Sequence, residues 1–145
     1  MPRARYLVGV DFSAESQRAL EAARRLARRS GASITIAHVR PLSDVRAAVV
    51  EERGDLLREP PRVLSREIAA HYARRLDGVA RGREKTRLLR GAPHFALPRE
   101  AKSGYDLLVV GRGGRGGVEG LFLGSTLTRT LSGSRVPVLV VPGKG

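Results

Sequence analysis

Hydrophobic and polar residues follow two different periods along the chain, and their order predicts strands that alternate with helices. Continuous apolar runs bounded by turn residues indicate buried strands. These runs occupy residues 5–11, 32–39, 105–111 and 136–141, and a shorter, weaker strand is predicted over 85–91. Between them, apolar residues recur at helical spacing and predict helices over 14–30, 62–79, 92–104 and 125–134. Such alternation indicates a mainly parallel sheet with helices on both faces, the three-layer α/β/α arrangement.

The first two helices are defined by their apolar faces, and the first also by its end residues. Ser13 is expected to be its N-cap, Glu15 lies in its first turn, and Gly31 is expected to end it. Its predicted buried positions are Ala19, Leu20, Ala23, Leu26 and Ala27. The second helix is expected to bury Leu64, Ile68, Tyr72, Leu76 and Val79.

Two segments are less regular. Pro98 falls inside the helix expected over 92–104, where a proline costs about 3 kcal/mol because it lacks an amide donor and clashes with the preceding turn. Either this helix begins late, with Pro98 in its first turn, or it is kinked there. Residues 41–61 have no clean period and contain Gly54 and Pro60-Pro61, so they are predicted to form a mobile connection.

The length and composition indicate one soluble, intracellular domain. A chain of 145 residues has the size of a single domain. It contains no apolar run near the roughly 20 residues that a membrane span needs, and Asp11 interrupts the segment where a signal peptide would continue its apolar core. The absence of cysteine fits a reducing compartment. We therefore expect one cytoplasmic domain over residues 1–145.

The net charge of +13 raises the question of a nucleic-acid partner. However, the 24 arginines are scattered over the chain, mostly on expected polar helix faces, and aromatic residues make up only 4% of the sequence. Too few aromatic residues are available for a base-stacking platform. This distribution favours solvated helix faces, while a polyanion-binding surface stays open as the alternative.

The stretch "VVGRGGRGGVEGLFLGST", residues 109–126, follows the strongest predicted strand and fits two phosphate-binding patterns. Gly111, Gly113 and Gly116 satisfy the dinucleotide fingerprint G-x-G-x-x-G. That fingerprint normally lies after the first strand, with an acidic residue at the end of the next one, and neither condition holds here. The dinucleotide pattern is therefore the weaker of the two.

The second pattern has the spacing Gly111-x2-Gly114-x9-Gly124-Ser125. Glycines at 111 and 114 let the backbone approach an anion, and Gly124 opens a helix whose free amides favour phosphate. A simpler alternative is a loose loop in which Ser125 only caps a helix.

With these motifs in view, the chain resembles the universal stress protein family of the UspA type over nearly its whole length. The resemblance rests on "YLVGVDFSAESQRALEAARRLA", "ITIAHV", "LLRGAP" and "YDLLVVGRGGRGGVEGLFLGSTLTRTLSGSRVPVLVVP". The last segment carries G-x2-G-x9-G-[S/T], the signature of ATP-binding members. The resemblance implies a Rossmann-like fold with a five-stranded parallel sheet in the order 3-2-1-4-5, with nucleotide between the ends of strands one and four.

The resemblance also implies particular residue roles. Asp11 would contact the ribose or adenine side, the Val39 backbone would contact adenine, and the glycine signature would bind ribose and phosphates. Any Mg²⁺ or Mn²⁺ would be held mainly by phosphate oxygens. At Arg112-Gly113 relatives often carry serine or threonine followed by histidine, and Arg112 could either strengthen phosphate binding or occupy its space. The implied nucleotide-binding set is Val10, Asp11, Phe12, Ser13, Val39, Gly111, Arg112, Gly114, Arg115, Gly124, Ser125 and Thr126.

The resemblance implies a homodimer formed by antiparallel pairing of the last strand, with Val136, Val138 and Val140 at the interface. No catalytic residue is predicted, because the three histidines have no ligand or nucleophile context and the glycine loop has no lysine for a terminal phosphate. The expected function is ATP binding as a stress sensor or regulator, with at most slow hydrolysis. A nucleotide-free module that binds a protein or polyanion, and a nucleotide hydrolase, are the alternatives.

Overall fold

The computed structural model describes residues 2–40, 61–113 and 124–143, without the side chains of residues 61–65 and 124. The predicted alternation of strands and helices is confirmed. The elements are β1 (Arg5–Gly9), α1 (Ala14–Ser30), β2 (Ser33–Arg40), α3 (Pro61–Val79), β3 (Lys85–Arg90), α4 (Pro93–Ala101), β4 (Leu107–Gly111), α5 (Gly124–Gly133) and β5 (Val138–Val141). The irregular segment expected over 41–61 lies outside the described residues, apart from Pro61.

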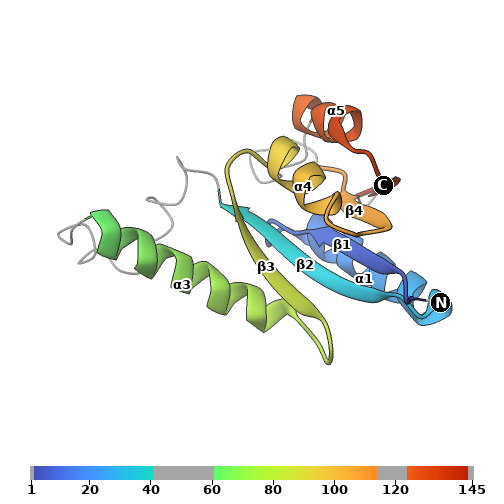
Figure 1. The fold of residues 1–145 in the computed structure, drawn as a ribbon, viewed down its shortest axis with the longest axis horizontal. Coiled ribbons are helices and arrows are strands. Elements are labelled where there is room, and N and C mark those ends of the chain that lie inside the picture. The colour runs from blue at the N-terminus through green and yellow to red at the C-terminus, as the bar shows by residue number, and fades with distance from the viewer. Residues whose placement is uncertain (1, 41–60, 114–123, 144–145) are drawn as a thin grey trace.

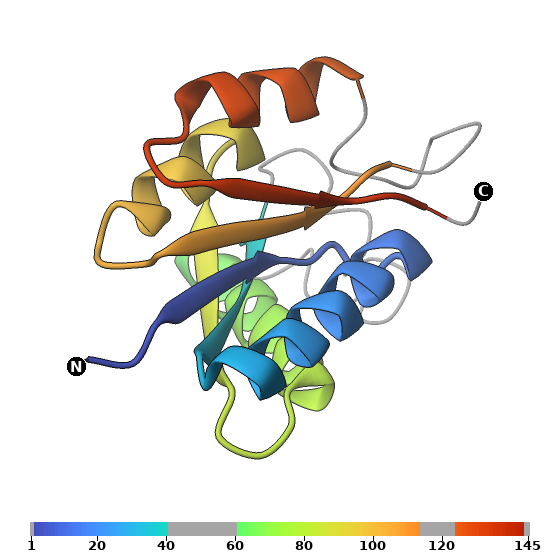
Figure 2. The same ribbon diagram turned by 90° about the vertical axis from the view of Figure 1, so that its right-hand side faces the viewer.

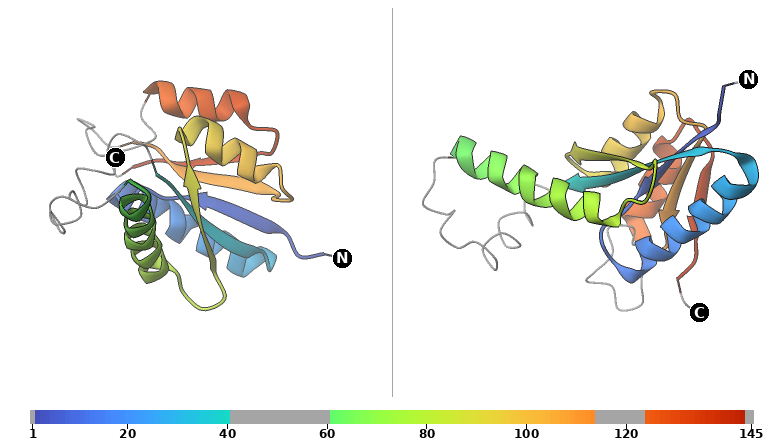
Figure 3. Two further views of the ribbon diagram at one scale, coloured as in Figure 1. Left: turned by 60° about the vertical axis from the view of Figure 1, so that its left-hand side comes forward. Right: turned by 90° about the horizontal axis from the view of Figure 1, so that it is seen from below.

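The five strands form one parallel sheet in the order β3-β2-β1-β4-β5, as the resemblance implied (Figure 1). Because β1 connects to β2 on one side and β4 to β5 on the other, right-handed crossovers place the helices on opposite faces. Figure 2 shows α4 and α5 on one face and α1 and α3 on the other. The first turns of α3 project beyond the sheet, on the side of the carboxyl end of β2 (Figure 3).

Each face of the sheet has its own hydrophobic core. Alternate residues of β1 point to opposite faces, so Tyr6 and Val8 pack with α1 and α3, whereas Leu7 packs with α4. The helix α1 begins at its predicted N-cap, where the Ser13 side chain accepts a hydrogen bond from the Ser16 backbone, and ends at Gly31 with φ +76°. Helices therefore cover both faces of the sheet, and its carboxyl edge contains the ends of β1 and β4.

Several sequence predictions need correction. Leu26, expected on the buried face of α1, is 37% exposed, because the buried face of that helix is formed by Ser16, Ala19, Leu20, Ala23, Arg24 and Ala27. Of the two alternatives for the helix expected over 92–104, the late start is wrong: α4 begins at Pro93 and contains Pro98 in its interior. Two strands also begin later than expected, since Asp106 is tied to the backbone of Arg5 ahead of β4, and Pro137 has no amide to donate ahead of β5.

Candidate functional site

The site predicted from the sequence lies where the chain leaves β1 and β4. These two strands are neighbours in the sheet, with Val8 paired to Val109, but the connection from β1 leads to α1 on one face and that from β4 leads towards α5 on the other. The space beyond these two strand ends, where open α/β sheets usually bind their ligands, is here called the crevice. Val10 and Asp11 lie at one strand end and Gly111 at the other.

Asp11 organises the turn that starts α1. Its Oδ1 accepts a hydrogen bond from the Ser13 backbone N–H at 3.0 Å and another from the Ser13 hydroxyl. The Ser13 Oγ in turn accepts from the Ser16 N–H at 3.1 Å. The carboxylate therefore holds Ser13, the N-cap of α1, in place, which is a structural role that needs no ligand, and it is half-buried.

Phe12 adopts a left-handed backbone conformation with φ +65°. Such a conformation is uncommon for a bulky residue and costs of the order of 1 kcal/mol or more, so the surroundings must hold it in place. The Phe12 ring lies 4.6 Å from that of His38, and the Arg75 guanidinium lies 4.3 Å from the Phe12 ring centroid. The side chain therefore fixes the turn after Asp11 against β2 and α3.

His38 and Tyr72 complete this aromatic cluster. Their rings stack with centroids 5.1 Å apart, and both side chains are buried. Burial lowers the pKa of His38, while a hydrogen bond between its Nδ1 and the Val10 carbonyl at 2.8 Å opposes that shift. The neutral ring is therefore favoured. No sequence pattern predicts this cluster, because His38 has no ligand or nucleophile context and Tyr72 is expected only on the buried face of its helix.

Val39 directs its backbone towards the crevice. The Ala37 carbonyl accepts from the Val10 N–H at 2.8 Å, so the backbone groups of Ala37 point to β1. Backbone groups two residues further along a strand point to the same side. The backbone groups of Val39 therefore point to the side of β1, beyond Gly9, which is the last β1 residue paired with β2. The Val39 side chain is buried in the core.

Gly111 has a packing role that the sequence did not reveal. A Cβ at this position would lie 2.7 Å from the Glu15 carbonyl oxygen and 3.3 Å from the Ser16 nitrogen. The end of β4 therefore packs directly against the first turn of α1. This contact explains why position 111 is a glycine, whether or not a ligand also approaches.

The structure describes part of the remaining glycine signature. The Arg112 side chain is exposed, and its backbone N–H donates to the Val141 carbonyl at 2.8 Å. Gly124 begins α5, with Ser125 exposed and Thr126 half-buried in the first turn. Gly114 and Arg115 lie outside the described residues.

Two arginines add positive charge at this end of the sheet, and the sequence analysis did not single them out. Arg40 ends β2 beside Arg90, which ends β3. Arg40 is buried, and burial together with the nearby Arg90 guanidinium lowers its pKa. The carboxyl edge therefore has a positive field that favours anions.

The described part of the chain has neither a metal-ligand cluster nor a membrane-spanning helix. There, no group of three or more histidine, aspartate or glutamate side chains could hold a metal ion. No helix in those segments is both long and apolar enough to cross a bilayer. The expected metal, held by phosphate oxygens, stays a prediction.

Of the predicted dimer residues, Val138 and Val140 lie on β5, an edge strand of the sheet, and Val136 lies just before it. Val136, Val138 and Val140 are half-buried and pack against the core beneath α4, so their side chains point to that layer. Leu139 points to the other face and is 36% exposed. An interface at this edge would therefore use the β5 backbone.

The sheet order and the two helical layers define a Rossmann-like, three-layer α/β/α fold. The sequence model of the Universal stress protein family matches residues 3–142. The chain belongs to this family.

Individual relatives agree with that assignment. A universal stress protein of Mycolicibacterium smegmatis is 33% identical over 136 residues, which are 93% of this chain but 44% of the relative, so the chain spans less than half of that protein. The structure of UspA from Lactobacillus plantarum is 26% identical with a TM-score of 0.66, and the match covers 97% of this chain and 99% of that one. A universal stress protein solved in complex with cAMP is 27% identical with a TM-score of 0.62, over 99% of this chain and all of that one.

Proposed function

We propose that this chain binds an adenine nucleotide, ATP, in the crevice between the carboxyl ends of β1 and β4, and acts as a cytoplasmic stress sensor or regulator. The observation that carries the proposal is the divergence of the two connections at these neighbouring strands, with Asp11 and Gly111 at their ends. The structurally similar protein in complex with cAMP supports an adenine nucleotide as the ligand class.

The described residues offer complementary contacts to the parts of such a ligand. The backbone of Val39 would bind the adenine edge, and the half-buried Asp11 carboxylate would accept hydrogen bonds from the ribose. The first-turn amides of α5, together with the Ser125 and Thr126 hydroxyls, would bind phosphate oxygens. Glycines 114 and 124 complete the signature in the sequence.

The positive field of Arg40, Arg90 and Arg112 supports a charged phosphate chain over an uncharged nucleoside. Mg²⁺ or Mn²⁺ would accompany the phosphates and take most of its ligands from them and from water. Because the glycine loop contains no lysine for the terminal phosphate, we expect binding with at most slow hydrolysis.

The proposal includes a single domain over residues 1–145 that forms a homodimer through β5. The outer edge of this strand offers backbone groups to an antiparallel partner strand, which would remove an otherwise exposed edge. Two copies paired in this way would join their sheets into one continuous sheet.

Isothermal titration of the folded protein with ATP, AMP, cAMP and NADH tests the ligand class. The expected result is saturable binding of ATP that is tighter than that of AMP, because of the added phosphates, with NADH the weakest ligand. Tightest binding of NADH would instead support the dinucleotide pattern of Gly111, Gly113 and Gly116. Absence of ATP binding at millimolar concentration, combined with salt-sensitive retention of RNA or DNA, would support the polyanion-binding alternative.

A further inference from the structure

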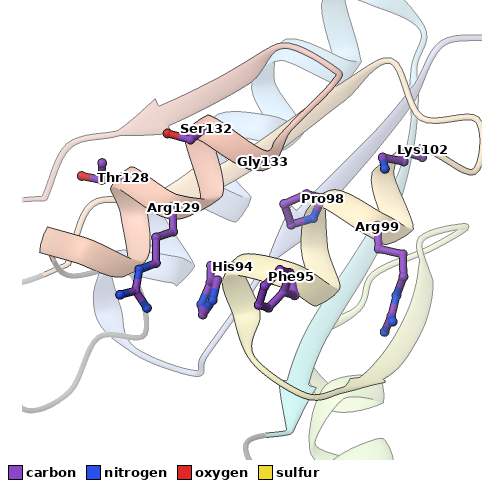
Figure 4. A pocket seen from close by; sticks show the side chains of 9 residues that line it. All are labelled: His94, Phe95, Pro98, Arg99, Lys102, Thr128, Arg129, Ser132 and Gly133. Atoms are coloured by element: carbon purple, nitrogen blue, oxygen red, sulfur yellow. The ribbon is translucent and has the colours of Figure 1, made fainter.

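A groove of about 800 Å³ lies between α4 and α5, on the outer side of their layer (Figure 4). Its volume falls within the range of about 300–1,000 Å³ that is typical of ligand pockets. The α5 part of its wall is formed by residues 128–133, in the second half of the helix, whereas the proposed phosphate contacts are in the first turn. The groove is therefore separate from the nucleotide crevice, although one helix contributes to both.

The walls of this groove carry only basic ionisable side chains among the residues that the structure describes. His94, Arg99 and Lys102 come from α4 and its end, and Arg129 comes from α5. In Figure 4 the Arg129 and His94 side chains extend side by side from the two helices. The one carboxylate of α4, Glu100, is paired with Arg87 on β3 at 2.9 Å. The charge of the groove is therefore not balanced by its own helices.

The groove also presents an apolar surface among these cations. Phe95 is 71% exposed, the highest value among the exposed large hydrophobic residues of the described segments. Its ring lies 4.6 Å from that of His94, whereas Pro98, which also lines the groove, is itself buried beside Gly133 of α5. A single exposed aromatic residue is ordinary on a protein surface. An aromatic residue in a groove bordered by basic side chains is a more specific arrangement.

We propose that this α4–α5 groove docks an acidic peptide segment of a partner protein, one that carries a single aromatic or aliphatic anchor. The anchor would pack on the exposed Phe95 ring, and the flanking carboxylates would pair with Arg99, Lys102 and Arg129. Charge complementarity carries this choice of occupant. The inference does not depend on nucleotide binding.

A fluorescence titration tests the proposal with a labelled probe peptide made of glutamates around one tryptophan. One control peptide has serine in place of the tryptophan, and another has glutamine in place of every glutamate. Both controls are expected to bind at least about tenfold more weakly than the probe, because anchor and charge both contribute. A serine peptide that binds as tightly as the probe would overturn the proposal.

Protein variants locate the binding. Phe95→Ser and Arg129→Glu are each expected to weaken probe binding about tenfold, whereas Arg83→Glu, the same charge change at an exposed site outside the groove, should change it less than about twofold. Circular dichroism confirms that each variant is folded. Equal losses for Arg83→Glu and Arg129→Glu would show general charge attraction and contradict the proposal. Sedimentation that shows self-association lost in Phe95→Ser would assign the groove to a second copy and also contradict it.

Discussion

Gly111 at the end of β4 lies against the first turn of α1, so closely that a Cβ would approach the Glu15 carbonyl oxygen to 2.7 Å. The contact joins the end of β4 to the first turn of the helix that follows β1, beside the proposed nucleotide crevice. Since the obstructing atom belongs to the backbone, it cannot move aside as a flexible side chain would. A signature glycine therefore has a stabilising role that is independent of any ligand.

The first prediction follows from this contact. Gly111→Ala is expected to lower the free energy of unfolding by about 1–3 kcal/mol without nucleotide, because β4 and α1 must separate to admit the methyl group. Gly78→Ala, in α3, is the matched control: a Cβ there meets nothing within 4 Å, and alanine is the better helix former. Urea unfolding measures both. An unchanged unfolding midpoint for Gly111→Ala would refute the packing role.

The Arg24–Glu84 pair supports a second prediction. Arg24 is 5% exposed and donates two hydrogen bonds to the Glu84 carboxylate, at 2.7 and 2.8 Å, and one to the Val79 carbonyl. Burial alone would raise the pKa of Glu84, but hydrogen bonds from the Arg24 side chain and the Arg81 backbone hold it below its ordinary value. The pair thus fixes α1 to the start of β3.

Removal of one partner should therefore be costly. Arg24→Met is expected to destabilise the fold by about 3 kcal/mol, because it leaves the Glu84 carboxylate largely buried without its counter-ion. The double variant Arg24→Met/Glu84→Gln should recover part of this loss. Arg28→Met, at an exposed position one turn further along α1, should change stability by less than about 0.5 kcal/mol in the same urea experiment. A loss for Arg24→Met no larger than that of the control would contradict this account.

His38 gives a third prediction, on pH dependence. Because burial lowers its pKa in the folded state, the unfolded chain binds the proton more readily. Its contribution to stability is therefore complete above the unfolded pKa of about 6.5 and is lost as the pH falls through the folded value. The charged groups near this ring are Asp11, which favours protonation, and Arg75, which opposes it.

The variant His38→Asn isolates this contribution. Asparagine can donate to the Val10 carbonyl as the His38 Nδ1 does, but it does not titrate. Stability is measured by urea unfolding at several pH values below 7. The loss of stability on acidification should be smaller in the variant than in the original protein. Parallel pH profiles would show that His38 does not contribute.

The proposed β5 dimer gives a fourth prediction. Leu108 and Arg112 donate to the carbonyls of Pro137 and Val141, so the backbone groups of Val138 and Val140 point away from β4. Val140→Pro would remove an outward N–H without removing a β4 hydrogen bond. We expect Val140→Pro to sediment as a monomer and Val140→Ala, which keeps the N–H, as a dimer. A dimer that persists in the proline variant would exclude pairing through this edge.

The sequence predicted the sheet and its helices well because their signals are local and repeated. The run from Leu107 to Gly111 is apolar on both faces, and Ser13 and Gly31 mark the ends of α1 with side-chain and backbone chemistry that acts within a few residues. Pro98 was harder to interpret, because its cost in a helix is offset by burial against the sheet and α5, which no local pattern reveals.

The site was only partly predictable for a related reason. Asp11 and the glycine signature are contiguous motifs, so the sequence could locate them. The Phe12–His38–Tyr72 cluster brings together β1, β2 and α3, and its members are neighbours only after the sheet has formed. The contact between Gly111 and Glu15 is likewise a property of the fold. Such relationships depend on long-range packing rather than on spacing along the chain.

The central claim, that an adenine nucleotide binds with its phosphates at the first turn of α5, is tested most directly by calorimetric titration of ATP into two variants. Ser125→Ala/Thr126→Val removes two hydroxyl donors from that turn, and Ser132→Ala removes one from the last turn of the same helix. Saturable ATP binding is expected for the original protein. Binding should be at least about tenfold weaker in Ser125→Ala/Thr126→Val and unchanged in Ser132→Ala. No ATP binding by the folded original protein, or equal binding by all three proteins, would contradict the central claim.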